Sequence, residues 1–317
     1  MYLYMKRILL IGASIIITSL LAIYVFIPSR IIITGAAIAE APDVAIERLL
    51  MDESHWPAWW KQCELNKFHS ATLSLNNYTL SLQQKYYKSL LFNIEYPNQN
   101  PVSSRLTLIP LRKDSTGFEW SCQLEAGNNP IQRLLNYRKA RAIKSLLDSC
   151  LQPCVRFFSN TQNVYGIQIE RTQLPDTLFV TAKKQFSSKP NQQDIYSLIK
   201  QIEEYIKTQE SKPSGSSIYN ISQLSENQFQ LMAGVPISMR IKENKPFEIK
   251  YMVPGSFLVT EVVGGEYSVQ HSARQLKQYF QDYKKTSMAM SFTMLVTDRS
   301  LQPDSSRWIT RLYEPVY

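Results

Sequence analysis

The first hydrophobic pattern in the chain is an uncharged run of twenty residues, Ile8 to Ile27, which follows Lys6 and Arg7. A bilayer-spanning helix needs about 20 predominantly apolar residues, whereas the apolar region of a cleaved signal peptide usually has about 7–15. The run therefore predicts an uncleaved, single-pass transmembrane helix over residues 8–27, in preference to a signal peptide or a buried core helix. The basic pair before it predicts a cytoplasmic N-terminus and an extracytoplasmic, periplasmic globular part.

Residues 31–158 combine two periodicities. Ile31-Ile32-Ile33-Thr34 predicts a strand, and Ala41-Pro42-Asp43 predicts the start of a short helix, because proline suits the first helical turn. Strands with alternating apolar and polar positions follow, which predicts a sheet with one buried face. After residue 130 the apolar positions recur at threes and fours, which predicts a long amphipathic helix. Its apolar positions are Ile131, Leu134, Leu135, Ala142, Leu146, Cys150 and Leu151.

Residues 159–317 contain an internal repeat. The strand segment that starts at Pro175 matches the one that starts at Pro254 at an offset of 79, and the helix around Leu198 matches the one around Leu276 at an offset of 78. Each unit reads as strand, proline turn, strand, helix, strand, strand. Both helix patterns are amphipathic, so each helix is expected to pack one face on a sheet. We expect an α+β fold with two such units about a pseudo-twofold axis.

The region 31–158 resembles the START-like SRPBCC superfamily, of the polyketide cyclase type. The residues that carry the resemblance are Ala41-Pro42, Val44, Leu49, Leu50, Trp56, Trp59 and Trp60. The resemblance implies a helix-grip domain, in which a curved antiparallel sheet holds the long C-terminal helix over an apolar cavity. Aromatic side chains on the concave sheet face would either line this cavity or fill it as plain core; they are Phe92, Tyr96, Phe118 and Trp120.

The region 159–317 resembles the GyrI-like small-molecule-binding domain, which is also the effector-binding domain of AraC-type and MerR-type activators. The residues that carry it are Val253-Pro254-Gly255, Gly264-Gly265-Glu266-Tyr267, Leu276, Leu295-Val296-Thr297-Asp298, and Trp308 to Val316. The resemblance implies a duplicated βαββ fold with a ligand cleft between 159–247 and 248–317. Many members carry an acidic residue where this chain has Thr293. We therefore expect a neutral ligand, or an empty cleft, in preference to a cation.

The residue inventory assigns no metal, cofactor or catalytic residue. The three histidines, His55, His69 and His271, are far apart, and no zinc, haem, iron–sulfur, phosphate-loop or nucleophile-elbow pattern is present. Glu261 and Glu266 are candidate acids for a hydrolase, although a solvated strand or turn explains both. The four cysteines, Cys63, Cys122, Cys150 and Cys154, allow three pairings, and Cys122 is expected to be a buried free thiol.

The chain carries 35 basic and 26 acidic residues, a net charge of +9. This excess is spread evenly over residues 1–30, 31–158 and 159–317, so it does not support a nucleic-acid partner. Arg133, Arg141 and Lys144 share one side of the long helix, and we interpret this side as a solvated helix face in preference to a contact with anionic lipid.

Taken together, the patterns predict a membrane-anchored protein that binds a small apolar or aromatic molecule and has no evident catalytic machinery. The candidate ligand-binding residues are Tyr251, Tyr267, Thr293, Trp308 and Tyr313, because tyrosine and tryptophan offer flat apolar surface with one polar tip. The alternative is a hydrolase or cyclase that uses a cavity carboxylate. A transcription regulator is disfavoured, because no helix-turn-helix signal precedes the effector-like region.

Overall fold

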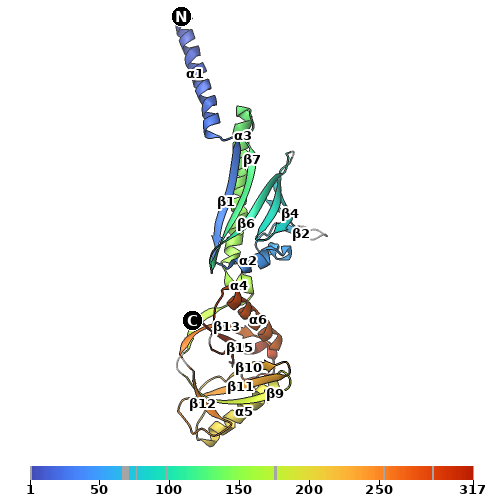
Figure 1. Cartoon of the computed structure of the whole chain (residues 1–317), viewed down its shortest axis with the longest axis vertical. Helices are drawn as coiled ribbons and strands as arrows, with labels where there is room; N and C mark the ends of the chain where they lie inside the picture. Colours follow the sequence, from blue (N-terminus) through green and yellow to red (C-terminus); the bar gives the residue numbers. More distant parts are fainter. Residues whose placement is uncertain are drawn as a thin grey trace. The chain divides into compact units, whose positions relative to one another are not determined.

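The computed structural model describes residues 2–65, 71–75, 77–97, 99–174, 177–252, 254–287 and 289–316. The chain forms two compact units, Met1–Asn160 and Thr161–Tyr317, here called the N-terminal and C-terminal units. Each contains one antiparallel sheet with helices, so the α+β class is confirmed (Figure 1). His69, Pro175 and Val253 lie outside the described residues.

The predicted transmembrane segment falls on helix α1 (Tyr2–Phe26). Among the residues that the structure describes, none of the helices combines the length and the hydropathy required to cross a bilayer. The structure therefore does not support the transmembrane helix over residues 8–27.

The N-terminal unit holds a seven-stranded sheet in the order β1-β7-β6-β5-β4-β3-β2. Its strands are β1 (Arg30–Ala39), β2 (Cys63–Leu65), β3 (Ala71–Leu75), β4 (Tyr78–Tyr86), β5 (Ser89–Glu95), β6 (Val102–Arg112) and β7 (Ser115–Glu125). Its other helical elements are α2 (Asp43–Leu50), the 3-10 helix η1 (Glu53–Ala58) and α3 (Pro130–Phe158). The predicted helix start is confirmed, with Pro42 as the cap of α2.

Helix α3 packs along strand β1, as Figure 1 shows. Gly35 of β1 makes this approach possible. A Cβ atom at Gly35 would lie 3.2 Å from Leu147 Cβ and from Leu151 Cδ1, closer than ordinary van der Waals contact. The glycine therefore lets the helix lie tightly on the sheet edge.

Packed aromatic side chains lie between the sheet and α3. Trp60 lies 5.1 Å from Trp56 and 6.1 Å from Trp120, and Phe92 lies 5.1 Å from Trp120, between ring centres. All four rings are buried. Trp60 Nε1 donates to the Cys150 carbonyl of α3 at 2.8 Å, so its polar atom also has a partner. These residues form a close-packed core where the family resemblance implies a cavity.

The prediction for the first turns of α3 was wrong. Ile131, Leu134, Leu135 and Ala142 are exposed. The buried side carries Arg133, Ala140 and Ile143 instead. Arg133 is buried because its guanidinium lies over the Tyr24 ring, at 4.4 Å, while its Nε donates to the Gly127 carbonyl. The interpretation of Arg133 as part of a solvated face was therefore also wrong.

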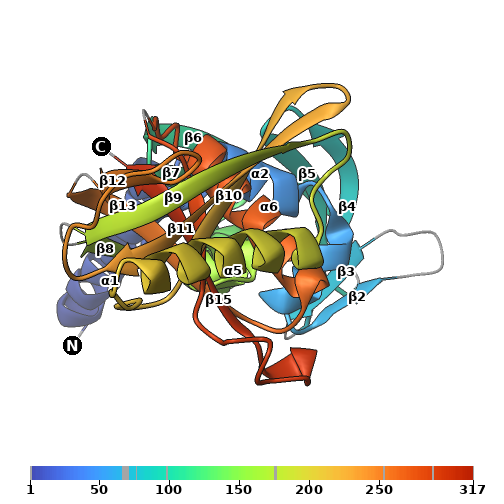
Figure 2. The ribbon, with the colours of Figure 1, turned by 90° about the horizontal axis from the view of Figure 1, so that it is seen from below.

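The C-terminal unit holds an eight-stranded sheet in the order β12-β9-β11-β10-β14-β15-β13-β8. Its strands are β8 (Glu170–Leu174), β9 (Thr177–Phe186), β10 (Ile218–Ser225), β11 (Gln228–Ile237), β12 (Glu248–Met252), β13 (Gly255–Val263), β14 (Phe292–Leu295) and β15 (Ile309–Val316). Its helical elements are α4 (Thr161–Tyr165), α5 (Gln192–Thr208), α6 (Glu266–Asp282) and the 3-10 helix η2 (Ser305–Arg307). Helix α5 crosses β9 and β11 (Figure 2).

The sheet order is symmetric about the junction of β10 and β14. The first repeat is β8-β9-α5-β10-β11 and the second is β12-β13-α6-β14-β15. The first strand of each repeat pairs with the second strand of the other, because β12 pairs with β9 and β8 pairs with β13. Each repeat therefore completes the half-sheet of its partner, as expected for a duplicated unit about a pseudo-twofold axis.

The offsets predicted for the repeat need correction. Val180 and Ala182 of β9 belong to the buried cluster that includes α5, and the corresponding buried residues of β13 are Leu258 and Thr260, so the outer strands repeat at 78 residues. The helices are both 17 residues long and begin at Gln192 and Glu266, so they repeat at 74. The connection before α6 is shorter than the one before α5. A four-residue slip leaves a helical hydrophobic pattern nearly unchanged, which is why the sequence match was one turn out of register.

Candidate functional site

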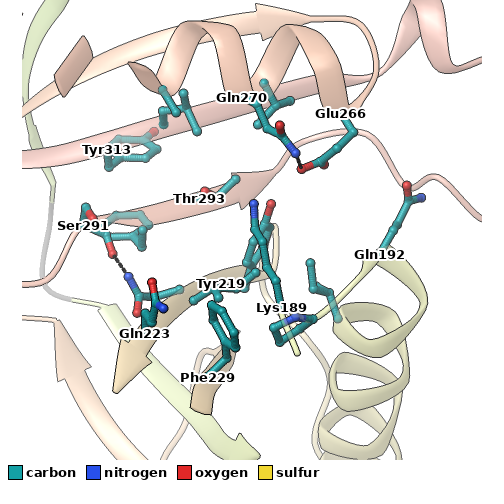
Figure 3. A pocket seen from close by; sticks show the side chains of 18 of the residues that line it. Lys189, Gln192, Tyr219, Gln223, Phe229, Glu266, Gln270, Ser291, Thr293 and Tyr313 are labelled. Atoms are coloured by element: carbon teal, nitrogen blue, oxygen red, sulfur yellow. Dashed lines mark hydrogen bonds between the residues drawn. The ribbon is translucent and has the colours of Figure 1, made fainter. Parts of the chain in front are cut away.

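A cleft of about 720 Å³ lies between the two repeats of the C-terminal unit. Its sheet side comes from β10, β14 and β15, and its walls come from the start of α5 and from α6 (Figure 3). A volume of this size matches the range of about 300–1,000 Å³ typical of small-molecule sites. Lining side chains include Lys189, Gln192, Ile195, Tyr219, Phe229, Glu266, Ala273, Leu276, Ser291, Phe292, Thr293, Leu312, Tyr313 and Glu314.

Tyr219 and Thr293 mark the centre of this cleft. They lie opposite each other where β10 pairs with β14, so their side chains project from the same face of the sheet, and the Thr293 hydroxyl lowers the pKa of the Tyr219 phenol slightly. Burial raises the pKa of the Tyr219 phenol, and the nearby Glu266 carboxylate adds to this shift. The hydroxyl therefore stays protonated and can act as both donor and acceptor toward a ligand.

One wall of the cleft is aromatic. The rings of Phe292 and Tyr313 are stacked, with centres 4.7 Å apart and planes at 12°. Phe257 meets Phe292 edge to face at 5.7 Å, which supports the stack from behind. Phe229 of β11 lies on another side of the cleft. Flat apolar rings of this kind offer contact area at little entropic cost.

Two carboxyl groups also line the cleft. Glu266 is exposed at the first turn of α6, where Gln270 Nε2 donates to it at 2.9 Å. Glu314 is half-buried, and its burial raises the pKa of the carboxyl although the charge of Lys277 opposes this shift. The expectation that the Thr293 position leaves the cleft without a countercharge therefore does not hold, because the acids come from α6 and β15.

The structure brings together only some of the predicted ligand residues. Thr293 and Tyr313 line the cleft. Tyr251 is exposed on the edge strand β12, and Tyr267 is 79% exposed on α6. Trp308 packs over the Arg299 guanidinium at 4.6 Å and donates from Nε1 to the Gln302 carbonyl at 2.6 Å, which is a structural role. None of these three is among the side chains that line the cleft.

Sequence reasoning missed several lining residues. Tyr219, Phe229 and Glu314 were not singled out. Tyr219 had a signal in the repeat, since it corresponds to Thr293 at the offset of 74, but the one-turn slip of the helix match concealed it. Glu261, a candidate acid, lies outside the cleft lining and pairs with Arg311 at 2.8 Å.

A second hollow of about 900 Å³ runs along the other side of α5, against residues 215–217 and 295–300. Its walls carry mainly charged and hydroxyl side chains, among them Lys200, Glu203, Lys207, Ser217 and Asp298. It lacks an aromatic platform like that of Phe292 and Tyr313. Although it is larger, it is the weaker candidate for an apolar ligand.

The described residues offer no group of three or more His, Cys, Asp or Glu side chains placed to hold a metal ion. Within the same residues, all four cysteines are free thiols, and Cys122 is buried as expected.

No protein-family model matches the chain, and no curated protein matches it significantly. Similar solved structures include the EcmrR–DNA complex, with 13% identity, a TM-score of 0.44, and coverage of 60% of this chain and 72% of that chain. SAV2435 bound to tetraphenylphosphonium has 16% identity and a TM-score of 0.35, over 48% of this chain and 94% of that chain. A START superfamily protein from Mycobacterium smegmatis has 12% identity and a TM-score of 0.27, over 37% and 94%.

Proposed function

We propose that the C-terminal unit binds a small, mainly apolar or aromatic molecule in the cleft between α5 and α6. The observation that carries this proposal is the cleft itself, which is drug-sized and spans both repeats. It combines a stacked aromatic wall, Phe292 and Tyr313, with a few polar groups at its centre, Tyr219 and Thr293. Apolar area would supply the affinity, and the hydroxyls would orient the ligand.

The strand topology supports two finer assignments, which we also propose. The N-terminal unit is a START-type helix-grip domain, because one long helix packs on an antiparallel sheet. The C-terminal unit is a GyrI-like domain, because it is a duplicated ββαββ unit with exchanged first strands. Of the two units, the C-terminal unit is the one that binds the ligand. The interior of the N-terminal unit has a structural role, because it is filled by the packed rings of Trp56, Trp60, Phe92 and Trp120.

Membrane attachment and an extracytoplasmic location stay predictions that rest on the apolar run from residue 8 to 27 and the basic pair before it. Protease digestion of intact spheroplasts tests them. Degradation of both units without lysis is expected, and protection until lysis would contradict the location.

The experiment for the binding site compares the unchanged full chain with a variant whose cleft is filled by a larger side chain. Native mass spectrometry first reports any molecule that co-purifies. Fluorescence titrations with a neutral aromatic, a lipophilic cation and an aromatic acid then rank ligand charge. Ala273 is exposed and lines the cleft, so Ala273→Trp should fill space without removing core contacts. We expect at least about tenfold weaker binding, since a blocked pocket loses most of its apolar contact.

His271→Trp is the matched control, because His271 is exposed on the same helix and does not line the cleft. Its affinity should equal that of the unchanged chain. If Ala273→Trp binds as tightly as the control, the ligand does not occupy this cleft.

A second candidate function is hydrolysis with Glu314 as the acid. The raised pKa of a half-buried carboxyl that faces a cleft is the arrangement that favours general acid catalysis. One measurement distinguishes ligand binding from hydrolysis: the chemical state of the bound molecule after incubation. A bound molecule recovered chemically unchanged after prolonged incubation supports binding alone. Conversion that is lost in Glu314→Gln supports the enzyme.

A further inference from the structure

The first three turns of α3 present their apolar side to solvent. Ile131 is 70% exposed and Leu135 is 57% exposed, and Leu134 is also exposed. At 100° per residue these three side chains share one side of the helix, opposite Arg133, Ala140 and Ile143. An amphipathic helix normally turns its apolar side inward. Here the inward side is already occupied, so the outward apolar side is left for a partner.

The last turn of α1 lies beside these residues. Tyr24 Oη donates to the Asn128 carbonyl at 2.5 Å, and the Arg133 guanidinium covers the Tyr24 ring at 4.4 Å. These contacts hold the end of α1 against the start of α3. Phe26 is 80% exposed there, and Val25 is exposed beside it. We call Val25, Phe26, Ile131, Leu134 and Leu135 the α1–α3 apolar surface.

Positive charge borders this surface. Residues 128–147 contain five basic residues and no acidic residue. Arg138 and Arg141 are exposed, and neither takes part in an ion pair among the described residues. Arg138 follows Leu134 and Leu135 on the same side of the helix, at the spacing of three and four that brings side chains together. Arg141 lies over the Tyr137 ring, at 6.0 Å. The surface therefore combines aliphatic side chains with arginines that form no ion pair among the described residues.

We propose that the α1–α3 apolar surface docks into the headgroup region of an anionic lipid bilayer. Helices that lie in this interface place aliphatic side chains toward the acyl boundary and basic side chains toward lipid phosphates. Long arginine side chains reach the headgroups while their stems stay on apolar surface. The cationic border complements an anionic membrane, and this selects lipid over a purely apolar protein partner. The docking concerns the outer side of α3 and does not require α1 to cross the bilayer.

Co-sedimentation of the full chain with vesicles tests the docking. One vesicle contains phosphatidylcholine alone, and the other contains equal parts of phosphatidylcholine and phosphatidylglycerol. The unchanged chain should prefer the anionic vesicles. L134E/L135E and R138E/R141E change exposed positions, so the fold should persist, and each should weaken binding at least about tenfold. The control is Leu301→Glu, because Leu301 is 82% exposed in the C-terminal unit; its binding should be unchanged.

If α1 alone holds the chain on the vesicles, sedimentation does not report on the α1–α3 apolar surface. Tryptophan quenching then tests directly whether this surface enters the bilayer. In Leu135→Trp, the introduced tryptophan should be quenched by brominated lipids, whereas that of Leu301→Trp should not. An unquenched tryptophan at position 135 would overturn the proposal, whatever the sedimentation shows. A dimer that L134E/L135E disrupts, without quenching at position 135, would overturn it in favour of a second copy of the chain.

Discussion

Tyr219 and Thr293 occupy the same position in the two repeats and face each other across the β10–β14 pairing. Two equivalent residues can pair in this way only on the pseudo-twofold axis, so this axis passes between them. The backbone is symmetric about the axis, but the side chains are not. Tyr313 and Glu314 of β15 correspond to Gly234 and Val235 of β11. The cleft is therefore chemically one-sided: the second repeat supplies the Tyr313 phenol and the half-buried Glu314 carboxyl where the first repeat has Gly234 and Val235.

The contact between the Tyr219 and Thr293 hydroxyls should couple the two repeats. We expect Tyr219→Phe and Thr293→Val each to lower the free energy of unfolding by about 1 kcal/mol, because each removes one of the two hydroxyls that interact across the β10–β14 pairing. In a double-mutant cycle the two losses should overlap, since the second substitution removes an interaction that is already lost. Urea denaturation of the four chains measures this.

Thr293→Ser is the control for this cycle, because it keeps the hydroxyl and removes one methyl group. Tyr219→Phe should therefore cost as much stability in the Thr293→Ser chain as in the unchanged chain. Strictly additive losses in the Thr293→Val cycle would show that the two hydroxyls do not interact at the junction of the repeats.

Period and alternation predicted the architecture because they report which side of an element is buried. Leu90, Phe92 and Phe118 are all buried, as the alternating pattern required. The duplication was also recognisable, since both helices keep an amphipathic pattern. The register of the helices within the repeat could not be recognised from the sequence, because a slip of one helical turn preserves that pattern. The true register became visible only through strand pairing, which is a long-range property.

The first turns of α3 show a second limit. Periodicity places Ile131, Leu134 and Leu135 on one side of the helix, but it does not say whether that side faces the core. Arg133 took the inner position because Tyr24, more than a hundred residues earlier, covers its guanidinium. The cleft had the same difficulty. Thr293 and Tyr313 were predicted, whereas Glu314 was not, because the sequence does not show that this position of β15 faces the cleft.

Gly35 provides a test of how α3 packs on β1. A Cβ there would meet Asp148 Oδ1 at 3.1 Å and two leucine side chains at 3.2 Å. Gly35→Ala should therefore lower the free energy of unfolding of the N-terminal unit by about 1–3 kcal/mol, the usual cost of overpacking. The matched control is Gly117→Ala on the neighbouring strand β7, where the nearest atoms lie at 3.6 Å. Thermal unfolding that ranks the two substitutions equally would contradict the tight helix–strand contact.

The four thiols should differ in reactivity. Burial raises the pKa of Cys122 to about 11 and of Cys150 to about 12, and it also raises that of Cys154. Cys63 is half-exposed, but burial and the neighbouring Glu53 and Glu64 raise its pKa to about 11. At pH 8 a thiol with that pKa is only about one part in a thousand thiolate, which is the reactive form.

Alkylation at pH 8 followed by intact mass spectrometry measures this difference. The folded chain should gain one adduct slowly, at Cys63, and the unfolded chain should gain four quickly. Rapid modification of Cys150 or Cys154 in the folded chain would mean that the core of the N-terminal unit opens readily.

Glu314 should make stability depend on pH. Its folded-state pKa is raised by burial, so the folded chain binds the proton more tightly than the unfolded chain does. Stability should therefore fall as the pH rises from the ordinary glutamate pKa of 4.5 through the raised value, and it should stay lower above that value.

Glu314→Gln removes this loss, so it should raise the urea midpoint at pH 7 and leave it unchanged at pH 3, where both states are protonated. Lys277→Gln is the companion variant: removing the charge that opposes the shift should raise the Glu314 pKa further, which NMR titration of the carboxyl detects. Equal stabilisation by Glu314→Gln at both pH values would trace the effect to packing and not to the buried charge.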